Sequence, residues 1–114
     1  MVGHLVSRGW IVLARNVPAG RHEIDVLAIE PGRAPTLVFV EVRSRSTDGF
    51  GEPEESVVGR KAFGMYRAAA TLAAAGTLPD GRELPRLPWR VDLVSVVMDR
   101  GRAQIRHIRG VDPG

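Results

Sequence analysis

The sequence predicts an α/β fold in which a mixed β-sheet is flanked by helices. One long segment places apolar residues at helical spacing, a short N-terminal segment has the pattern of a helix end, and five others have the composition or alternation of strands. Their order along the chain is helix, three strands, helix and two strands, which is typical of a sheet packed against helices. The length of 114 residues suits one domain, and we expect residues 1–114 to form it.

The N-terminal part is predicted to form a short helix and a first strand. Val2 to Gly9 has the pattern of a helix end, with Gly9 as the C-terminal stop. Trp10 to Val17 is predicted as the strand. Pro18 to Gly20 then makes a turn, because proline and glycine favour turn conformations.

A β-hairpin is predicted in the next segment. His22 to Glu30 forms its first strand, with the alternate apolar residues from Ile24 to Ala28 on one face. Pro31 to Pro35 is the connection. Thr36 to Ser44 returns as the second strand of the hairpin and is rich in β-branched residues.

The C-terminal half is predicted to contain a long helix and two strands. After a polar loop at 45–53, residues 54–75 form the helix, which begins with acidic residues that suit its positive end. A proline-containing loop covers 77–88. The strands 89–98 and 103–109 complete the expected sheet.

The composition limits the classes of protein to which the chain can belong. The absence of cysteine excludes disulfides and thiolate metal sites, so we expect a cytoplasmic protein. The longest apolar stretches are far shorter than the roughly 20 residues of a membrane helix, so no membrane association is expected. The net charge of +3 fits a phosphate-rich partner, although an arginine-preferring genome also produces basic proteins.

Two carboxylates are predicted to meet on the hairpin. If the hairpin is centred on Arg33, paired residues have numbers that add to 66, so Asp25 lies opposite Glu41 and Leu27 opposite Phe39. Opposed like charges are destabilising, and a bound cation would offset the repulsion. Mg²⁺ suits such a site, and Mn²⁺ can replace it. The alternative is structural: Glu41 pairs with an arginine and Asp25 faces solvent.

Several short pieces form a spaced pattern that spans nearly the whole chain. They are Gly9 with Ala14 to Asn16, Glu23 to Asp25, Phe39 to Arg45, Phe50 with Gly51, Lys61, and Arg90 to Asp92. Together they resemble the YraN family of bacterial proteins, which belongs to the PD-(D/E)XK, or restriction-endonuclease-like, nuclease superfamily.

The resemblance implies a fold and an activity. The fold is the restriction-endonuclease-like αβββαβ core, and the activity is metal-dependent phosphodiester hydrolysis by an endonuclease, with Holliday-junction resolvases as the nearest functional analogy. It implies that Asp25 and Glu41 are catalytic metal ligands, and that Arg43 stands where the superfamily usually has its lysine. The expected partner is nucleic acid, most simply DNA, and a two-fold substrate such as a junction would suit a homodimer.

Further basic residues are candidates for contact with nucleic acid. Lys61 is the only lysine and lies beside the apolar face of the long helix, so it either replaces the displaced catalytic lysine or is an ordinary surface residue. Arg45, Arg60 and Arg67 either line a groove for the phosphate backbone or are solvated charges. Arg21 is a weaker candidate for the same groove.

Other polar and aromatic residues are given structural roles. Asp92, among apolar residues of a strand, is expected to pair with an arginine. The three histidines show no metal-ligand spacing and are expected at the surface or in turns. Trp10 and Trp89 are expected to pack at the edges of the core.

The leading hypothesis is therefore a Mg²⁺-dependent endonuclease in which Asp25 and Glu41 hold the metal, the Val42 carbonyl is a further ligand, and Arg43 and Lys61 act on the phosphate. Arginine stays protonated and is a poor general base, and no Asp or Glu precedes Glu23, although resolvase-like relatives carry a carboxylate on the first helix. These departures favour a first alternative, a catalytically inactive nucleic-acid-binding module. A protein interaction adaptor is a second alternative.

Overall fold

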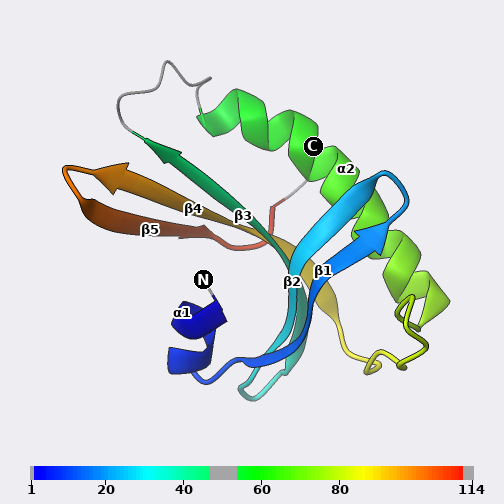
Figure 1. Ribbon diagram of the computed structural model, residues 1–114. Helices are drawn as coiled ribbons and strands as arrows, with labels where there is room; N and C mark the ends of the chain where they lie inside the picture. The colour runs from blue at the N-terminus through cyan, green and yellow to red at the C-terminus, as the bar shows by residue number, and fades with distance from the viewer. Residues whose placement is uncertain (1, 47–53, 112–114) are drawn as a thin grey trace.

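The computed structural model describes the backbone of residues 2–46 and 54–111. It describes the side chains of residues 2–44 and 64–111. The predicted order of elements is confirmed (Figure 1). The elements are α1 (Val2–Ser7), β1 (Ile11–Ala19), β2 (His22–Glu30), β3 (Thr36–Ser46), α2 (Glu54–Ala75), β4 (Trp89–Asp99) and β5 (Arg102–Ile108).

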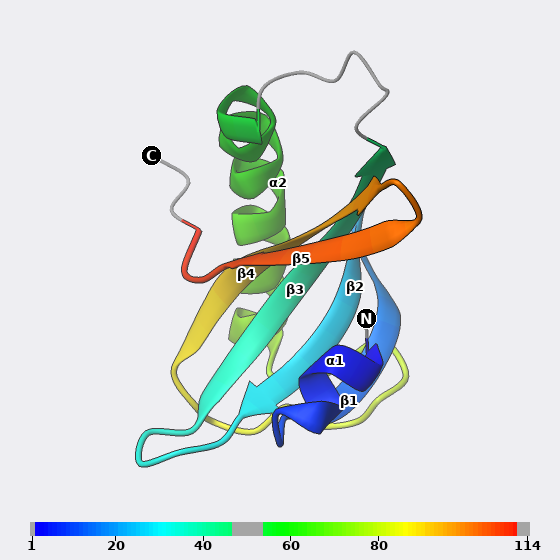
Figure 2. The same cartoon turned by 90° about the vertical axis from the view of Figure 1, so that its left-hand side faces the viewer.

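The five strands form one mixed sheet in the order β1-β2-β3-β4-β5. All neighbouring pairs are antiparallel except β3 and β4, which are parallel. Parallel neighbours need a crossover connection, and α2 provides it. The sheet has α2 on one face and α1 on the other (Figures 1 and 2). The fold therefore belongs to the α/β class, as predicted, and it is consistent with the restriction-endonuclease-like core.

Each face of the sheet has its own apolar core. The core under α2 joins the C-terminal half of that helix to the sheet, through Met65, Ala69 and Leu72 on the helix and Leu27 and Phe39 on the strands. The core under α1 contains Leu5, Trp10, Val26, Ala28, Val38, Val40 and Val94. Adjacent residues such as Leu27 and Ala28 therefore serve opposite cores, as the alternation of a strand requires.

The first turn lies later in the chain than predicted. Strand β1 continues through Pro18 and Ala19, and the turn is formed at Gly20, where the positive φ of 63° suits glycine. Proline is tolerated here because β1 is an edge strand.

The predicted face of β2 is also corrected. Val26 and Ala28 lie in the core under α1, but Ile24 lies in the core under α2 together with Leu27. A regular strand puts residues three apart on opposite faces, so β2 must bend or twist between Ile24 and Leu27. Figure 1 shows this curvature. Asp25 lies at the bend.

Within the described residues, no helix has both the length and the apolar character to cross a membrane.

Candidate metal centre

The sheet divides where β2 and β3 part. The predicted register, with numbers adding to 66, is confirmed from Glu30 opposite Thr36 to Val26 opposite Val40, and the described pairing ends there. Beyond this point β2 continues only beside β1, and β3 continues beside β4 as far as Ser46. Figure 1 shows β1 and β2 curving away together from β3, β4 and β5. The result is a fork with its apex next to Asp25 and Glu41.

Asp25 bridges the two arms of the fork through its side chain. The Val42 backbone N–H donates to Asp25 Oδ2 at 2.8 Å, and the Asp25 side chain is partly buried. The predicted backbone pair between Asp25 and Glu41 is therefore not among the described ladder pairs, because the Asp25 carboxylate takes the place of a strand partner. Within the described part of the chain, this hydrogen bond is the only polar contact of Asp25, so Oδ1 accepts none there.

Glu41 immediately follows the last residue of β3 that pairs with β2. By alternation it lies on the same face as Leu37 and Phe39, which contact the core under α2. Its side chain is half-buried, as is that of Asp25. Two half-buried acidic residues from neighbouring strands thus directly follow or precede the last described pair of β2 and β3.

The Val42 carbonyl also faces the fork. The N–H and C=O of one strand residue point to the same neighbouring strand, as the exchange of both bonds in a hydrogen-bonded antiparallel pair requires. Since the Val42 N–H reaches Asp25 on β2, its carbonyl is directed toward the β2 side as well. The Asp25 carboxylate and the Val42 carbonyl thus lie between the two arms of the fork, and Glu41 is the residue next to Val42 on β3.

Two of the predicted basic residues, Arg43 and Arg67, have described side chains. Arg43 is half-buried and follows Glu41 by two residues on β3, which places both on the same face of the strand. Arg67 is exposed on α2. The side chains of Arg45, Arg60 and Lys61 lie outside the described residues, so their roles stay predictions.

The donor set is compatible with Mg²⁺ or Mn²⁺. No group of three or more histidine, aspartate or glutamate side chains that could hold a metal occurs in the described residues. A complete protein cage of such side chains is therefore not present there. Mg²⁺ typically uses one or two carboxylates, retains several waters and takes substrate phosphate as a ligand, so two carboxylates and a carbonyl suit it.

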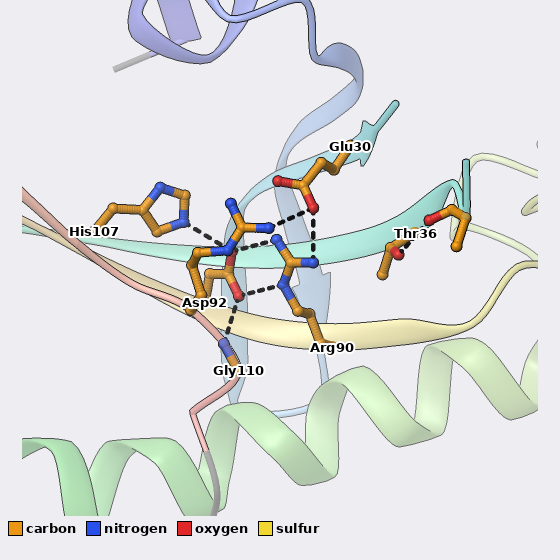
Figure 3. A network of polar contacts seen from close by, with 8 residues as sticks. Glu30, Thr36, Arg90, Asp92, His107 and Gly110 are labelled. Carbon is orange, nitrogen blue, oxygen red and sulfur yellow. Dashed lines mark hydrogen bonds and ion pairs between the residues drawn. The ribbon is translucent and has the colours of Figure 1, made fainter. Parts of the chain in front are cut away.

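Away from the fork, the Asp92 carboxylate on β4 is the centre of a buried network (Figure 3). Asp92 is completely buried. Arg90 binds it through two hydrogen bonds, from Nε to Oδ1 at 2.9 Å and from Nη2 to Oδ2 at 3.1 Å. His107 Nε2 lies 2.8 Å from Oδ2, and the Gly110 N–H donates to Oδ1 at 2.9 Å. The predicted pairing of Asp92 with an arginine is confirmed.

Glu30 extends the network toward the protein surface. Its Oε1 accepts from Arg90 Nη1 at 2.9 Å and from Arg109 Nη2 at 2.6 Å. The network thus joins the end of β2 to β4 and to the segment after β5. It fixes the C-terminal segment against the sheet.

His107 contradicts the prediction that all histidines lie at the surface or in turns. Its side chain is only 10% exposed, and its ring lies 5.6 Å from that of Trp10. Trp10 is buried, as predicted, and the Arg90 guanidinium lies 5.8 Å from its ring centre. The histidine was missed because its partner Asp92 is 15 residues away in sequence. The spacing of Arg90 and Asp92, two apart on one strand face, was the available signal for the network.

Both carboxylates of this network are held in the ionised state. Burial by itself raises the pKa of Asp92, but the hydrogen bonds from Arg90, Gly110 and His107 outweigh it and lower the pKa below the ordinary value. For Glu30, burial likewise raises the pKa, and the hydrogen bonds from Arg90 and Arg109 bring it below the ordinary value. Asp92 is therefore fully engaged in structure, unlike Asp25.

Comparison with known proteins gives a consistent family assignment. The uncharacterised protein family UPF0102 matches residues 1–96. A UPF0102 protein of Mycolicibacterium smegmatis is 37% identical over 111 residues, which are 96% of this chain and 84% of that protein. One from Corynebacterium efficiens is 39% identical over 113 residues, covering 97% and 84% of the two chains. One from Moorella thermoacetica is 38% identical over 96 residues, covering 84% and 72%.

The family match includes β2, β3 and both fork carboxylates, so it agrees with the resemblance found in the sequence. The chain belongs to family UPF0102, the YraN family, a member of the restriction-endonuclease-like nuclease superfamily.

Proposed function

We propose that this protein is a metal-dependent nuclease that hydrolyses phosphodiester bonds in DNA. The observation that carries the proposal is the fork itself: two half-buried carboxylates, Asp25 and Glu41, lie where β2 and β3 part. Like charges at such a position repel and lose hydration, and a divalent cation offsets both costs. The family assignment supports the nuclease proposal through the fold alone.

Asp25, Glu41 and the Val42 carbonyl are the proposed metal ligands. The 2.8 Å hydrogen bond from the Val42 N–H fixes the Asp25 carboxylate, so that Oδ1 is the oxygen available to a cation. Carbonyl and carboxylate oxygens are ligands that Mg²⁺ and Mn²⁺ accept. When bound, such an ion lowers the pKa of a coordinated water and stabilises negative charge on phosphate.

Arg43 is the proposed phosphate ligand. It lies two residues after Glu41 on the same strand face, and it is half-buried, where screening by water is weaker than at the surface. A guanidinium stays protonated at any ordinary pH and donates hydrogen bonds in a planar fork. Arg43 therefore stabilises charge on the phosphate oxygens and does not remove a proton from water.

Cleavage assays with isosteric variants test this proposal. Asp25→Asn keeps an oxygen that accepts from the Val42 N–H but removes the negative charge, so the fork should retain its shape. The substrates are an end-labelled four-way DNA junction, a linear duplex and a single strand, each with Mn²⁺, Mg²⁺ or EDTA. Glu23→Gln is the matched control, because Glu23 is an exposed carboxylate on the same strand.

We expect cleavage of at least one DNA substrate that requires the metal. In Asp25→Asn the rate should fall below about 1% of the wild-type rate, because the metal supplies the activated water. Glu23→Gln should cleave at the wild-type rate. Metal-dependent cleavage that is unchanged in Asp25→Asn would contradict the proposal.

A second function, nucleic-acid binding without cleavage, is favoured by two specific observations. Arginine stands at position 43, and α1 (Val2–Ser7) carries no acidic residue in its first turn. Arginine therefore stands where the superfamily usually has a lysine, and the described residues of α1 supply no carboxylate to the site. Salt-sensitive binding of DNA in EDTA that is equal in wild type and Asp25→Asn, with no cleavage of any substrate, would select this function.

A further inference from the structure

The two edge strands of the described sheet differ in how well they resist pairing with a further strand. In β1 the register against β2 shifts between Val12 and Ala14. Pro18, near the end of β1, has no N–H to donate. Bulges and prolines are common devices that keep an edge strand from pairing with another molecule. β1 is therefore a protected edge.

β5, at the other edge of the described sheet, is regular and exposed. Its register against β4 runs without a shift along all seven of its residues. It contains no proline, and the side chains of residues 102–106 are all exposed. A regular edge strand presents a row of backbone donors and acceptors with which another strand can pair. Of the two described edges, β5 is therefore the one that suits a partner strand.

An apolar patch lies on β4 and β5, on the face of the sheet that carries α1. Val94 belongs to the core under α1, and by alternation Val96 and Met98 lie on the same face of β4. Val96 is opposite Ile105, and Met98 is opposite Ala103. Ile105 is 44% exposed and Met98 is 45% exposed, so the apolar surface continues beyond the core into water. Figures 1 and 2 show the β4–β5 turn projecting away from both helices.

The length of β5 suits pairing with a second copy of the same strand. A two-fold axis perpendicular to the sheet makes two copies of β5 antiparallel and keeps each face of the sheet continuous. With the axis at Ile105, opposed residues have numbers that add to 210, and all seven residues of β5 find a partner. An axis at any other residue leaves part of the strand unpaired.

The charges of β5 select the same axis. With the axis at Ile105, Arg106 lies opposite Gln104 of the second copy. Arg102 then lies opposite Ile108. An axis at Gln104 would instead place Arg102 opposite Arg106, and an axis at Arg106 would place that residue opposite itself. Directly opposed like charges are destabilising, so pairing around Ile105 is favoured.

The apolar patch becomes partly buried around this axis. Ile105 lies opposite itself, so the two isoleucine side chains meet on the face of the sheet that carries α1. Val96 of each copy flanks its own Ile105. Removal of this exposed apolar surface from water adds to the backbone hydrogen bonds of the new strand pair.

We propose that β5 is the interface of a homodimer, in which two copies of the strand pair antiparallel around Ile105 and the sheet runs continuously through both subunits. A second copy of this chain is the occupant, because the strand is complementary to itself in length, charge and apolar surface. The proposal does not rest on the proposed nuclease activity, since it uses no residue of the fork.

Sedimentation velocity of the full chain tests the proposal. We expect wild type to be dimeric at concentrations of about 10–100 µM. Ile105→Asp should raise the dissociation constant of the dimer at least about tenfold, because it puts two carboxylates opposite each other and removes the apolar contact. Circular dichroism checks that the variant keeps the wild-type fold.

Ile11→Asp is the matched control. Ile11 lies on β1, the other described edge strand, and is 56% exposed. This variant should dimerise like wild type. A monomeric wild type, which would leave β5 to a strand of another protein, would overturn the proposal. Equal weakening of the dimer by the two variants, or a dimer unaffected by Ile105→Asp, would overturn it as well.

Chemical cross-linking locates the interface even if Ile105→Asp does not fold. The chain has no cysteine, so one introduced thiol reports on one position. Directly opposed residues on antiparallel strands have Cβ atoms about 4.5–5.5 Å apart, which is within reach of a short bis-maleimide. Ile105→Cys should form a covalent dimer in high yield, whereas Ile11→Cys should form little. Equal yields, or no covalent dimer from Ile105→Cys, would overturn the proposal.

Discussion

Asp25 and Asp92 are both aspartates in the sheet, but their surroundings differ completely. Asp92 is fully buried and accepts from Arg90, His107 and the Gly110 N–H. Asp25 is half-buried and, in the described part of the chain, accepts only one hydrogen bond, from the Val42 N–H. One carboxylate is neutralised and enclosed by the protein, whereas the other is oriented by a backbone donor.

The two aspartates differ in how completely the protein satisfies their carboxylate oxygens. A buried carboxylate is tolerated where arginine and backbone donors satisfy it, and it then fixes the elements that supply them. A carboxylate at a fork, where the ladder pairing has stopped, costs less hydration and keeps an oxygen accessible. We therefore expect substitutions at the two positions to have opposite effects on stability and on ligand binding.

The largest expected effect is on stability. Asp92→Ala should lower the free energy of unfolding by about 3–5 kcal/mol, because it leaves the Arg90 guanidinium without its buried partner. Asp25→Asn should change it by about 1 kcal/mol or less, because the amide oxygen still accepts from Val42. Urea denaturation measures both. Similar losses of unfolding free energy at positions 92 and 25 would contradict the proposed difference between the two aspartates.

Acid is expected to have an intermediate effect on the stability of the folded protein. The pKa values of Asp92 and Glu30 are lower in the folded protein than the ordinary values, so the folded state binds fewer protons there than the unfolded state. Their contribution is complete above the unfolded-state values of about 4 and is lost as the pH falls through the lower folded-state values.

Denaturation of wild type and Asp92→Asn between neutral pH and pH 3 checks this effect. The variant should be less stable at neutral pH, and its further loss in acid should be smaller than that of wild type. An identical loss in acid would mean that Asp92 does not contribute to the pH dependence.

The smallest effect is expected at the rim of the Asp92 network. Arg109 binds Glu30 but is 52% exposed, so water screens the pair. Arg109→Gln should cost about 0.2–1 kcal/mol, the usual range for an exposed ion pair. A thermal or urea transition compared with that of Asp92→Ala measures it. A cost equal to that of Asp92→Ala would show that the contribution of each ion pair to stability does not depend on its burial.

The sequence predicted the order of elements and the central hairpin register, because apolar alternation and the turn around Arg33 are local signals. It did not predict where β2 and β3 separate, since the twist of β2 between Ile24 and Leu27 depends on packing against both helices. The side-chain bond from Asp25 to the Val42 backbone follows from that separation. Asp25 and Glu41 were both singled out from the pattern, and their role as metal ligands stays a prediction.

Contacts that are distant in sequence were the least predictable. An arginine partner for Asp92 was expected, and Arg90 lies only two residues away. His107 and Glu30 join the same network from other strands, and a single histidine carries no spacing signal of its own. The closeness of Gly64 to the ring of His22 was also not predictable, because only the folded chain brings these two residues together.

Calorimetric titration of Mn²⁺ tests the central claim most directly, with wild type, Asp25→Asn and Asp92→Asn compared under conditions where all three are folded. We expect Asp25→Asn to abolish metal binding, whereas Asp92→Asn, despite its lower stability, should bind Mn²⁺ like wild type. Metal binding that survives in Asp25→Asn and disappears in Asp92→Asn would contradict the assignment of the fork as the metal centre.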